Sequence, residues 1–453
     1  MAEKKTTAKT APAPAVETVE NPVNKMIDGL VEKAQAALKE FLTLDQEQID
    51  HIVHEMALAG LDKHQELARM AVEETGRGVY EDKVIKNMFA TEYIWHDIKK
   101  EKTVGVLDEN EMEGYVEVAE PVGVIAGVTP TTNPTSTTLF KSLIAVKTRN
   151  PIIFGFHPSA QKCSAEAARI VYEAAVKAGA PENCIQWIDK PSIEATGALM
   201  NHPGVATILA TGGPGMVKAV YSCGRPGFGV GQGNCQEIIC DDYDDLDRLA
   251  MLAINNRSYD NGVPCTSEQT MHVPASMEAK FLEAMQKNGA YLVEGDELVD
   301  ALRKVVFPDG ERINRDVVGR SPQVVGKMIG IDVPANCKTL LCKYTGCAHD
   351  DVLSKEVLFP FIRYVTYTDF KATIAAAVAN LEMEGAGHNS CIWTHDEEKI
   401  EYAANLLPVS RFQINQTPSG INNGMPTTTT LGCGTWGNNS ISENLEWYHL
   451  MNT

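Results

Sequence analysis

The chain has 453 residues, and 60 Asp and Glu against 40 Lys and Arg give it a formal net charge of −20. This length predicts two or three domains, at roughly 150 residues per domain, and the 44% hydrophobic and 22% charged content is that of a globular protein. The acidic balance argues against nucleic acid and anionic membranes as partners, and the lack of a long uninterrupted apolar stretch argues against a membrane span.

The N-terminal part of the sequence changes character once. Residues 1–21 contain almost no large apolar side chains, so we expect a disordered tail. From residue 24 onward, apolar residues recur at helical spacing over 24–42, 45–59 and 63–73. Residues 24 to about 100 are therefore predicted to form an amphipathic helical section.

Strands and helices then alternate. We expect strands at 114–120, 123–128, 152–156, 185–188, 205–210 and 236–240, and helices at 133–147, 160–178, 192–200 and 215–223. After residue 265 the alternation resumes, with a helix at 275–288 and strands at 339–342 and 361–367. This spacing is typical of βαβ units, whose parallel sheet is covered by helices on both faces. The predicted fold class is α/β, with two such domains that meet near residues 255–268.

The cysteines are the first candidates for chemistry. Eleven cysteines without a C-x-x-C pair, and an N-terminus without a secretory signal, predict reduced thiols in a cytoplasmic protein. Cys337, Cys342 and Cys347 recur every five residues, whereas zinc sites usually show closer pairs, so we expect no metal. Cys265 lies in DNGVPCTSEQ (260–269), a turn where a cysteine is more often structural than catalytic.

Three other segments have the composition of ligand-binding loops. TPTTNPT (129–135) and TGGPG (211–215) each follow a predicted buried strand and open a helix, where backbone N–H groups attract anions. Asn133 adds a side-chain amide donor. Glycines alternate in GFGVGQGN (227–234), which allows a backbone to approach a ligand closely. Each segment alone fits an ordinary βα turn equally well.

Six motifs follow one another along the chain: TPTTNPT, ATGGPG, GVGQGN, DNGVPCTSEQ, KEVLFP (355–360) and TLGCGTWGNNS (430–440). Together they resemble the aldehyde dehydrogenase superfamily, and specifically its coenzyme A-acylating branch. The chain is most similar to the N-terminal half of the bifunctional aldehyde–alcohol dehydrogenases of fermenting bacteria. This resemblance covers residues 24–453.

The resemblance implies a role for each matching residue. Cys265 corresponds to the nucleophile, and Asn133 with the backbone N–H of Cys265 corresponds to the oxyanion donors. Glu356 corresponds to the carboxylate that holds the nicotinamide ribose, and Leu431 to a residue beside the nicotinamide. The other positions implied to line the NAD cofactor are Val128, Thr129, Pro130, Thr131, Thr132, Asn133, Gly213 and Gly231.

The sequence departs from the hydrolytic aldehyde dehydrogenases where those enzymes keep the glutamate that activates water. Residues 225–236 contain no carboxylate, so we expect slow attack by water and coenzyme A as the co-substrate that takes the acyl group. His388, in GHNSC (387–391), stands where hydrolytic members usually have a small apolar residue. It is a candidate catalytic base for the coenzyme A thiol, and the alternative is a loop histidine satisfied by the backbone.

A second departure concerns the adenosine end of the cofactor. The Lys and Glu that grip the adenosine ribose in hydrolytic members fall near Gly155 and Pro158. These positions contain no carboxylate, so no negative side chain would repel the 2′-phosphate of NADP. NAD is the expected cofactor, and NADP stays open.

The resemblance also implies the aldehyde dehydrogenase fold. We expect a Rossmann-like dinucleotide domain over 22–255 with a hairpin near 104–118, a catalytic α/β domain over 256–426, and a C-terminal oligomerisation strand over 427–453. These elements imply a homo-oligomer, a dimer or larger, and filaments if the full-length chain includes an alcohol dehydrogenase half. The chain ends at Thr453, where bifunctional relatives continue, so a truncated half and a monofunctional protein both stay open.

The expected function is that of an acetylating acetaldehyde dehydrogenase in fermentative metabolism. Such an enzyme interconverts acetyl-CoA and NADH with acetaldehyde, NAD and coenzyme A through a cysteine thioester, so its partners are a small aldehyde and an acyl-CoA. Two alternatives stay open: a hydrolytic aldehyde dehydrogenase that releases free acid, and a subunit whose main role is filament or complex assembly.

Overall fold

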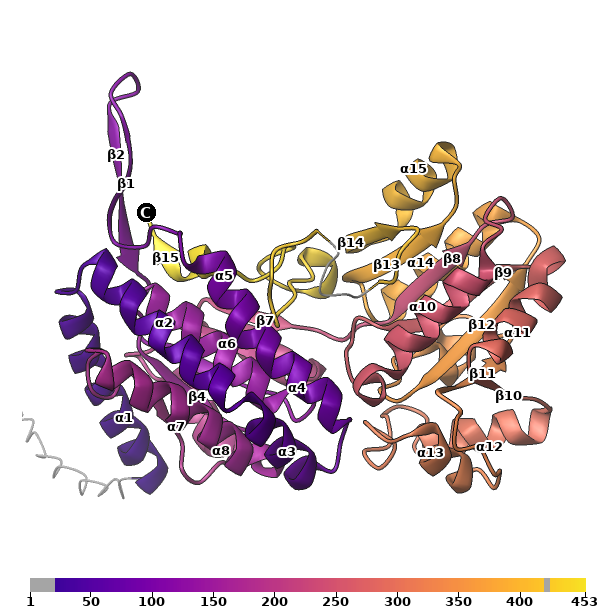
Figure 1. Cartoon of the computed structure of the whole chain (residues 1–453), viewed down its shortest axis with the longest axis horizontal. Coiled ribbons are helices and arrows are strands. Elements are labelled where there is room, and N and C mark those ends of the chain that lie inside the picture. The colour runs from indigo at the N-terminus through magenta and orange to yellow at the C-terminus, as the bar shows by residue number, and fades with distance from the viewer. Residues whose placement is uncertain (1–20, 419–423) are drawn as a thin grey trace, which may run out of the picture.

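The structure is a computed structural model that describes residues 21–418 and 424–453, so the tail predicted for 1–21 lies outside the described residues except for Asn21. Figure 1 shows two α/β halves side by side, with a narrow hairpin projecting from the first half and the last strand at its base. Within the described ranges, no helix is long and apolar enough to cross a membrane.

Helices from the N-terminal section cover the first half. α1 begins at Pro22 because Asn21 Oδ1 accepts a hydrogen bond from the Val23 N–H at 2.9 Å. Such a cap satisfies an N–H group that has no partner inside the helix. The section contains α1 (Pro22–Phe41), α2 (Gln46–Asp62), α3 (His64–Thr75), α4 (Tyr80–Met88) and α5 (Ile94–Ile98).

The first sheet has five parallel strands in the order β5-β4-β3-β6-β7. Its strands are β3 (Ile125–Val128), β4 (Ile152–Gly155), β5 (Ile185–Trp187), β6 (Thr207–Thr211) and β7 (Gly227–Val230), and its helices are α6 (Pro134–Lys147), α7 (Gln161–Lys177), α8 (Ile193–Asn201) and α9 (Pro214–Ser222). Apolar side chains of α2, α6 and α7 pack on one face, and those of α1 and α8 pack on the other. The strand order reverses between β3 and β6.

The second sheet has seven parallel strands in the order β10-β11-β12-β9-β8-β13-β14. Its strands are β8 (Cys235–Ile239), β9 (Glu268–Pro274), β10 (Ala290–Val293), β11 (Thr339–Lys343), β12 (Phe361–Tyr367), β13 (Gly387–Trp393) and β14 (Val409–Ile414). The helices around it are α10 (Leu246–Ser258), α11 (Glu278–Lys287), α12 (Asp296–Val306), α13 (Pro322–Met328), α14 (Phe370–Met383) and α15 (Glu397–Leu406). Buried apolar clusters join these helices to the sheet.

The chain crosses from the first sheet to the second at residues 231–234, because β8 pairs with β9 and β13. The boundary predicted at residue 255 therefore falls inside α10, which packs on the second sheet. Sequence reasoning placed the boundary too late because β8 has the same buried apolar pattern whichever sheet it joins.

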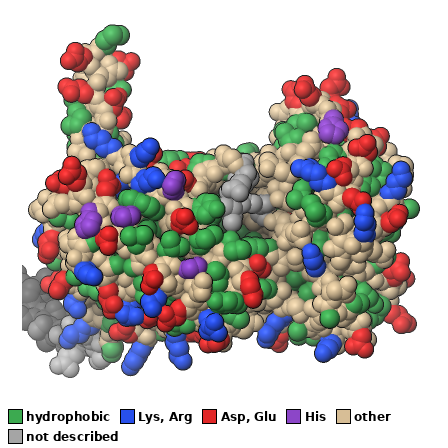
Figure 2. Space-filling view, viewed as in Figure 1, with side chains coloured by type: hydrophobic (Ala, Val, Ile, Leu, Met, Phe, Trp, Pro, Cys, Tyr) green, Lys and Arg blue, Asp and Glu red, His purple; other side chains and the backbone are tan. Residues whose placement is uncertain are grey.

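A third, three-stranded sheet projects from the body. β1 (Gly105–Asn110) and β2 (Tyr115–Pro121) form an antiparallel hairpin, at the position predicted near 104–118, and β15 (Met451–Asn452) pairs with β2. Figure 2 shows acidic side chains along this hairpin and over α15.

Two predicted segments differ from the structure. Gly227–Val230, predicted as part of a glycine-rich loop, forms β7 at the edge of the first sheet. The strand predicted over 427–453 is limited to Met451–Asn452, and Leu431 and Asn444 add only an isolated bridge. Strand β7 was not predicted because two of its residues, Gly227 and Gly229, have low strand propensity.

Candidate active site

The loops after β3 and β6 lie where the strand order of the first sheet reverses. Ligands of open parallel sheets bind at such a point, outside the carboxyl ends of the strands. Val128 ends β3, and Gly213 precedes α9 without a side-chain cap on the first N–H groups. The buried Thr129 hydroxyl has no hydrogen-bond partner among the described residues, and a Cβ on Gly213 would meet nothing within 4 Å. An open helix start and an orphaned hydroxyl fit a dinucleotide.

Asn133 immediately precedes α6 but does not cap it. Its side-chain Oδ1 accepts instead from Lys86 Nζ at 2.6 Å, and Lys86 is held by Asp260 Oδ2, also at 2.6 Å. The lysine, which has no acceptor atom, thereby fixes which end of the amide is the oxygen. The Asn133 nitrogen donates one hydrogen bond to Thr132 Oγ1 at 3.3 Å and keeps a second N–H for a ligand, and Asn133 lines the cavity beside Cys265.

The turn before Cys265 is built from three successive left-handed residues. Asp260, Asn261 and Gly262 have φ values of 47°, 52° and 67°, a region that costs energy for residues other than glycine. The buried Asp260 carboxylate holds the turn, because it accepts from the Val79 N–H at 2.7 Å and from Lys83 Nζ at 3.0 Å. The DNG motif is thus explained by the shape of this turn.

Glycines bring the motif segments into backbone contact. A Cβ on Gly233 would overlap the carbonyl of Cys265. A Cβ on Gly262 would lie 2.6 Å from the carbonyl carbon of Phe359, in KEVLFP. The GVGQGN, DNGVPCTSEQ and KEVLFP segments therefore pack against one another so closely that no side chain fits between them.

Cys265, His388 and Asn389 form a hydrogen-bonded chain. Cys265 Sγ lies 3.2 Å from His388 Nε2, and His388 Nδ1 lies 2.6 Å from Asn389 Oδ1. The Asn389 amide nitrogen donates to the carbonyls of Thr266 at 2.8 Å and Pro418 at 2.9 Å, so its Oδ1 faces the histidine and can only accept. The proton of the neutral imidazole therefore sits on Nδ1, and the Nε2 lone pair faces the thiol.

Burial controls the protonation of this pair. Burial, followed by the charge of Glu356, raises the pKa of Cys265 to about 12, although the residue is partly exposed. Burial, followed by Arg411, lowers the pKa of His388 to about 3. At pH 7 the resting pair is a neutral thiol beside a neutral imidazole. Glu356 is also protonated then, because burial and then Glu384 raise its pKa to about 8.

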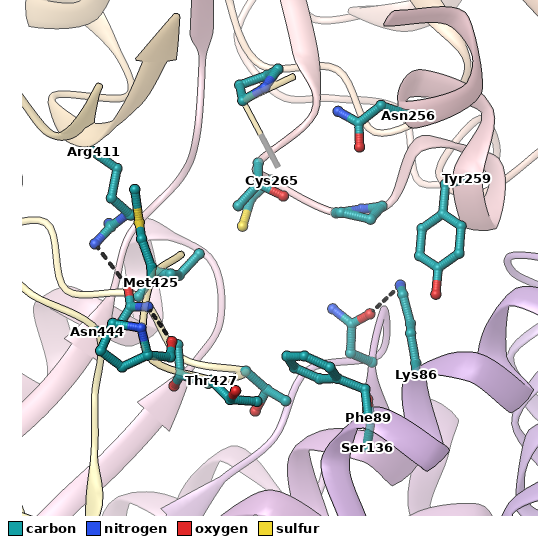
Figure 3. Close-up of a pocket in the computed structure, with 18 of the residues that line it drawn as sticks. Lys86, Phe89, Ser136, Asn256, Tyr259, Cys265, Arg411, Met425, Thr427 and Asn444 are labelled. Carbon is teal, nitrogen blue, oxygen red and sulfur yellow. Dashed lines mark hydrogen bonds between the residues drawn. The ribbon is translucent and has the colours of Figure 1, made fainter. Parts of the chain in front are cut away.

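A cavity of about 420 Å³ opens beside Cys265. Figure 3 shows Lys86, Phe89 and Ser136 on the first half facing Cys265 and Arg411 on the second. The volume of the cavity is in the range of small-molecule binding sites. Among the described lining residues there is no carboxylate, so the lining itself offers no acidic side chain as a base for water.

The structure brings most of the sequence-predicted site residues to two places. Cys265, Asn133 and Leu431 line the cavity, and His388 is buried behind Cys265. The dinucleotide-binding residues predicted from the family lie at the carboxyl ends of the first sheet: Val128, Thr129, Pro130, Thr131, Thr132, Gly213 and Gly231. Glu356 accepts from the Gly233 N–H at 2.9 Å.

Three functional side chains were missed by sequence reasoning. Asn389 was adjacent to a candidate histidine, and Asp260 began a recognisable turn, so each had a local signal. Lys86 had none, because it lies 47 residues before Asn133 on a helix where lysines are usually solvated. The predicted absence of a metal at Cys337, Cys342 and Cys347 stays a prediction, and no group of three metal-ligating side chains gathers in the described ranges.

Comparisons with known proteins bear on the family and the fold. The family model "Aldehyde dehydrogenase family" matches residues 2–303. Aldehyde-alcohol dehydrogenase 2 of Entamoeba histolytica is 44% identical over an alignment of 448 residues that covers 95% of this chain and 51% of that protein. Succinate-semialdehyde dehydrogenase (acetylating) of Clostridium kluyveri is 43% identical over 430 residues, 94% of each chain. An acetylating aldehyde dehydrogenase from Geobacillus thermoglucosidasius has a TM-score of 0.92 at 39% identity, covering 96% of this chain and 97% of that one.

The chain therefore belongs to the aldehyde dehydrogenase family, and the predicted α/β fold is confirmed. It is similar to the aldehyde half of the aldehyde–alcohol dehydrogenases and to acetylating enzymes. It spans about half the length of the aldehyde–alcohol dehydrogenases it matches and nearly all of the Clostridium kluyveri protein.

Proposed function

We propose that this protein is a coenzyme A-acylating aldehyde dehydrogenase that interconverts acetaldehyde, NAD and coenzyme A with acetyl-CoA and NADH in fermentative metabolism. The contact of 3.2 Å between Cys265 Sγ and His388 Nε2, beside a cavity whose described lining has no carboxylate, supports it best. Such a site offers a nucleophile and a base for a thiol. Two of the relatives compared above are named as acetylating enzymes, which agrees with this chemistry.

In the first half-reaction Cys265 attacks the aldehyde carbonyl. Its S–H bond breaks and the proton moves to Nε2 of His388, while Nδ1–H stays bonded to Asn389. The amide nitrogen of Asn133 donates to the carbonyl oxygen as that oxygen becomes negative, because Lys86 holds the amide oxygen. A nicotinamide bound here would supply the acceptor for the hydride that leaves the aldehyde carbon. Loss of that hydride leaves the acyl group on Cys265 as a thioester.

In the second half-reaction the thiol of coenzyme A removes the acyl group. After His388 has lost its proton to solvent, Nε2 accepts the thiol proton of coenzyme A. The new sulfur bonds to the acyl carbon and the bond to Cys265 breaks. The departing Cys265 sulfur takes the proton from Nε2, which restores the resting neutral thiol and neutral imidazole. Residues 225–236, which contact Cys265 through Gly233, contain no carboxylate that could activate water instead.

From the family positions we propose that the cofactor binds at the carboxyl ends of the first sheet. The loop 128–133, Gly213 and Gly231 would hold the NAD dinucleotide, with Glu356 and Leu431 at its nicotinamide end. The open start of α9 and the orphaned Thr129 hydroxyl support this placement. The cavity of about 420 Å³ is larger than a two-carbon acyl group needs, which leaves room for the thiol arm of coenzyme A.

Reduction of acetyl-CoA by NADH tests the proposal. Cys265→Ala should abolish this reduction and also acetaldehyde oxidation, because both need the thioester. Cys337→Ala is the matched control, since Cys337 is a partly exposed thiol that does not line the cavity. Activity above a trace in Cys265→Ala, or an equal loss in the control, would contradict the assignment.

We also propose that the protein works in the cytoplasm as a homo-oligomer, a dimer or larger. Its eleven cysteines are all free, which suits a reducing compartment. The edge strand β1 and the exposed Val106, Val116 and Val118 on the hairpin are surfaces that oligomers usually cover. Val118→Lys should lower the molar mass measured by light scattering, and an unchanged mass would contradict the role of the hairpin.

A further inference from the structure

Three arginines converge where the two halves of the molecule meet, outside the residues of the cavity. Arg77 lies in the loop between α3 and α4, and Arg315 and Arg320 lie in the loop before α13. The two loops touch, because the Gly78 N–H donates to the Gly319 carbonyl at 3.0 Å. In Figure 1 they face each other across the junction of the halves.

This arginine cluster (Arg77, Arg315 and Arg320) has no carboxylate partner among the described residues. In the described ranges no carboxylate oxygen lies within 4.0 Å of the three guanidinium groups, although the chain has 60 acidic residues. Burial lowers the pKa of Arg77, and Arg315 and Arg320 lower it further against the opposing charge of Asp316. Cations that approach one another in this way repel, so the arrangement favours a bound anion.

The cluster also lies at a defined place on the first sheet. Arg77 Nη1 donates to Thr131 Oγ1 at 2.7 Å, in the loop that follows β3. His157 lies two residues after β4. Burial lowers its pKa, and the positive charges of Arg77 and Arg315 lower it further. Arg77 therefore stands beside the loop that follows β3, the charge of Arg315 reaches His157 after the end of β4, and Arg320 lies next to Arg77, 3.7 Å from a Cβ built on Gly76.

In dinucleotide-binding sheets, the carboxyl end of the strand next to the first strand is a ribose-binding position. The strand beside the first one ends next to the adenosine ribose, where a carboxylate selects a free 2′-hydroxyl and an arginine accommodates a phosphate. Residues 155–160, at the end of β4, contain no carboxylate. The guanidinium fork matches phosphate oxygens better than any other side chain does.

We propose that Arg77, Arg315 and Arg320 bind a phosphate monoester on the ribose of an adenine coenzyme. This inference rests on the proposed function, which places such a coenzyme at this end of the sheet. Two coenzymes carry the group: NADP on its 2′-oxygen and coenzyme A on its 3′-oxygen. The chemistry of recognition is the same, and ligands that lack the phosphate distinguish the two sources.

The test uses the double variant Arg315→Gln/Arg320→Gln in the full chain. Fluorescence titration gives the Kd of NADPH and NADH, and steady-state kinetics give the KM of coenzyme A and of dephospho-coenzyme A. We expect the preference for the phosphorylated ligand to fall about tenfold or more in one pair. A fall for NADPH over NADH identifies the 2′-phosphate, and a fall for coenzyme A over its dephospho form identifies the 3′-phosphate.

Arg312→Gln is the matched control, because Arg312 lies in the same loop but pairs with Asp309 at 3.1 Å. It should change neither ratio. Equal weakening of all four ligands in the double variant, or unchanged ratios in both pairs, would overturn the proposal. The nucleotide titration needs no turnover, so a failure of acyl transfer to coenzyme A would contradict the proposed function without altering this result.

Discussion

Replacement of Asn389 by leucine should slow every step that needs the Cys265 thiolate. The side chain keeps a similar size, but His388 Nδ1 loses the acceptor 2.6 Å away that holds its proton. A hydrogen bond from a charged donor contributes about 1.5–3 kcal/mol, so the thiolate–imidazolium pair should become about 10- to 150-fold rarer. With the thiol pKa raised to about 12, deprotonation without His388 supplies little thiolate at pH 7.

The assay is the alkylation rate of Cys265 by iodoacetamide, followed on its own peptide by mass spectrometry because ten other cysteines are present. Ser390→Ala is the matched control, since Ser390 is the next residue of β13 and its hydroxyl donates to the Gln236 carbonyl. Thermal melts check that both variants are folded. Equal alkylation rates in the folded Asn389→Leu variant and the control would refute the argument from the imidazole tautomer.

Three further changes test other parts of the site. Asn133→Ala should lower kcat about 10²–10³-fold, the usual cost of one oxyanion donor. Lys86→Met should lower kcat less. If Asn133→Ala raised only the KM of NADH, Asn133 would be a binding residue and not an oxyanion donor. Between about pH 4.5 and 8, folded Glu356 keeps a proton that the unfolded chain releases, so stability should fall as pH rises. Glu356→Gln should flatten this slope in thermal melts, and an unchanged slope would contradict the shift. Gly233→Ala should lower activity and melting temperature together, because its Cβ would overlap the Cys265 carbonyl; a fully active variant would exclude that packing.

Much of the fold was predictable because its signals are local. The apolar run at 123–128 and the helix opened by Pro134 correspond to β3 and α6, since buried parallel strands and proline-led helices have simple patterns. The strand β7 was not predictable from its residues, because two of its four residues are glycines, which usually mark loops. Gly227 is required there by packing: its Cβ would lie 2.6 Å from a methyl group of Val220 on α9.

Some residues of the site were predictable from sequence motifs, and the contacts that orient them were not. Cys265 and Asn133 stand in motifs that are continuous in sequence, so a resemblance could identify them. The contacts that prepare them are long-range: Lys86 reaches Asn133 across 47 residues, and Cys265 meets His388 across 123. Such pairs depend on how elements far apart in sequence pack within each half, which no local pattern encodes.

The measurement that tests the central claim most directly is the time course of NADH formation from acetaldehyde and NAD without coenzyme A. The account predicts a burst of about one NADH per active site followed by near-silence, because the cavity lining and residues 225–236 contain no carboxylate to activate water. Addition of coenzyme A should restore steady turnover and yield acetyl-CoA. Sustained NADH production with free acetate as the product, in the absence of coenzyme A, would contradict it.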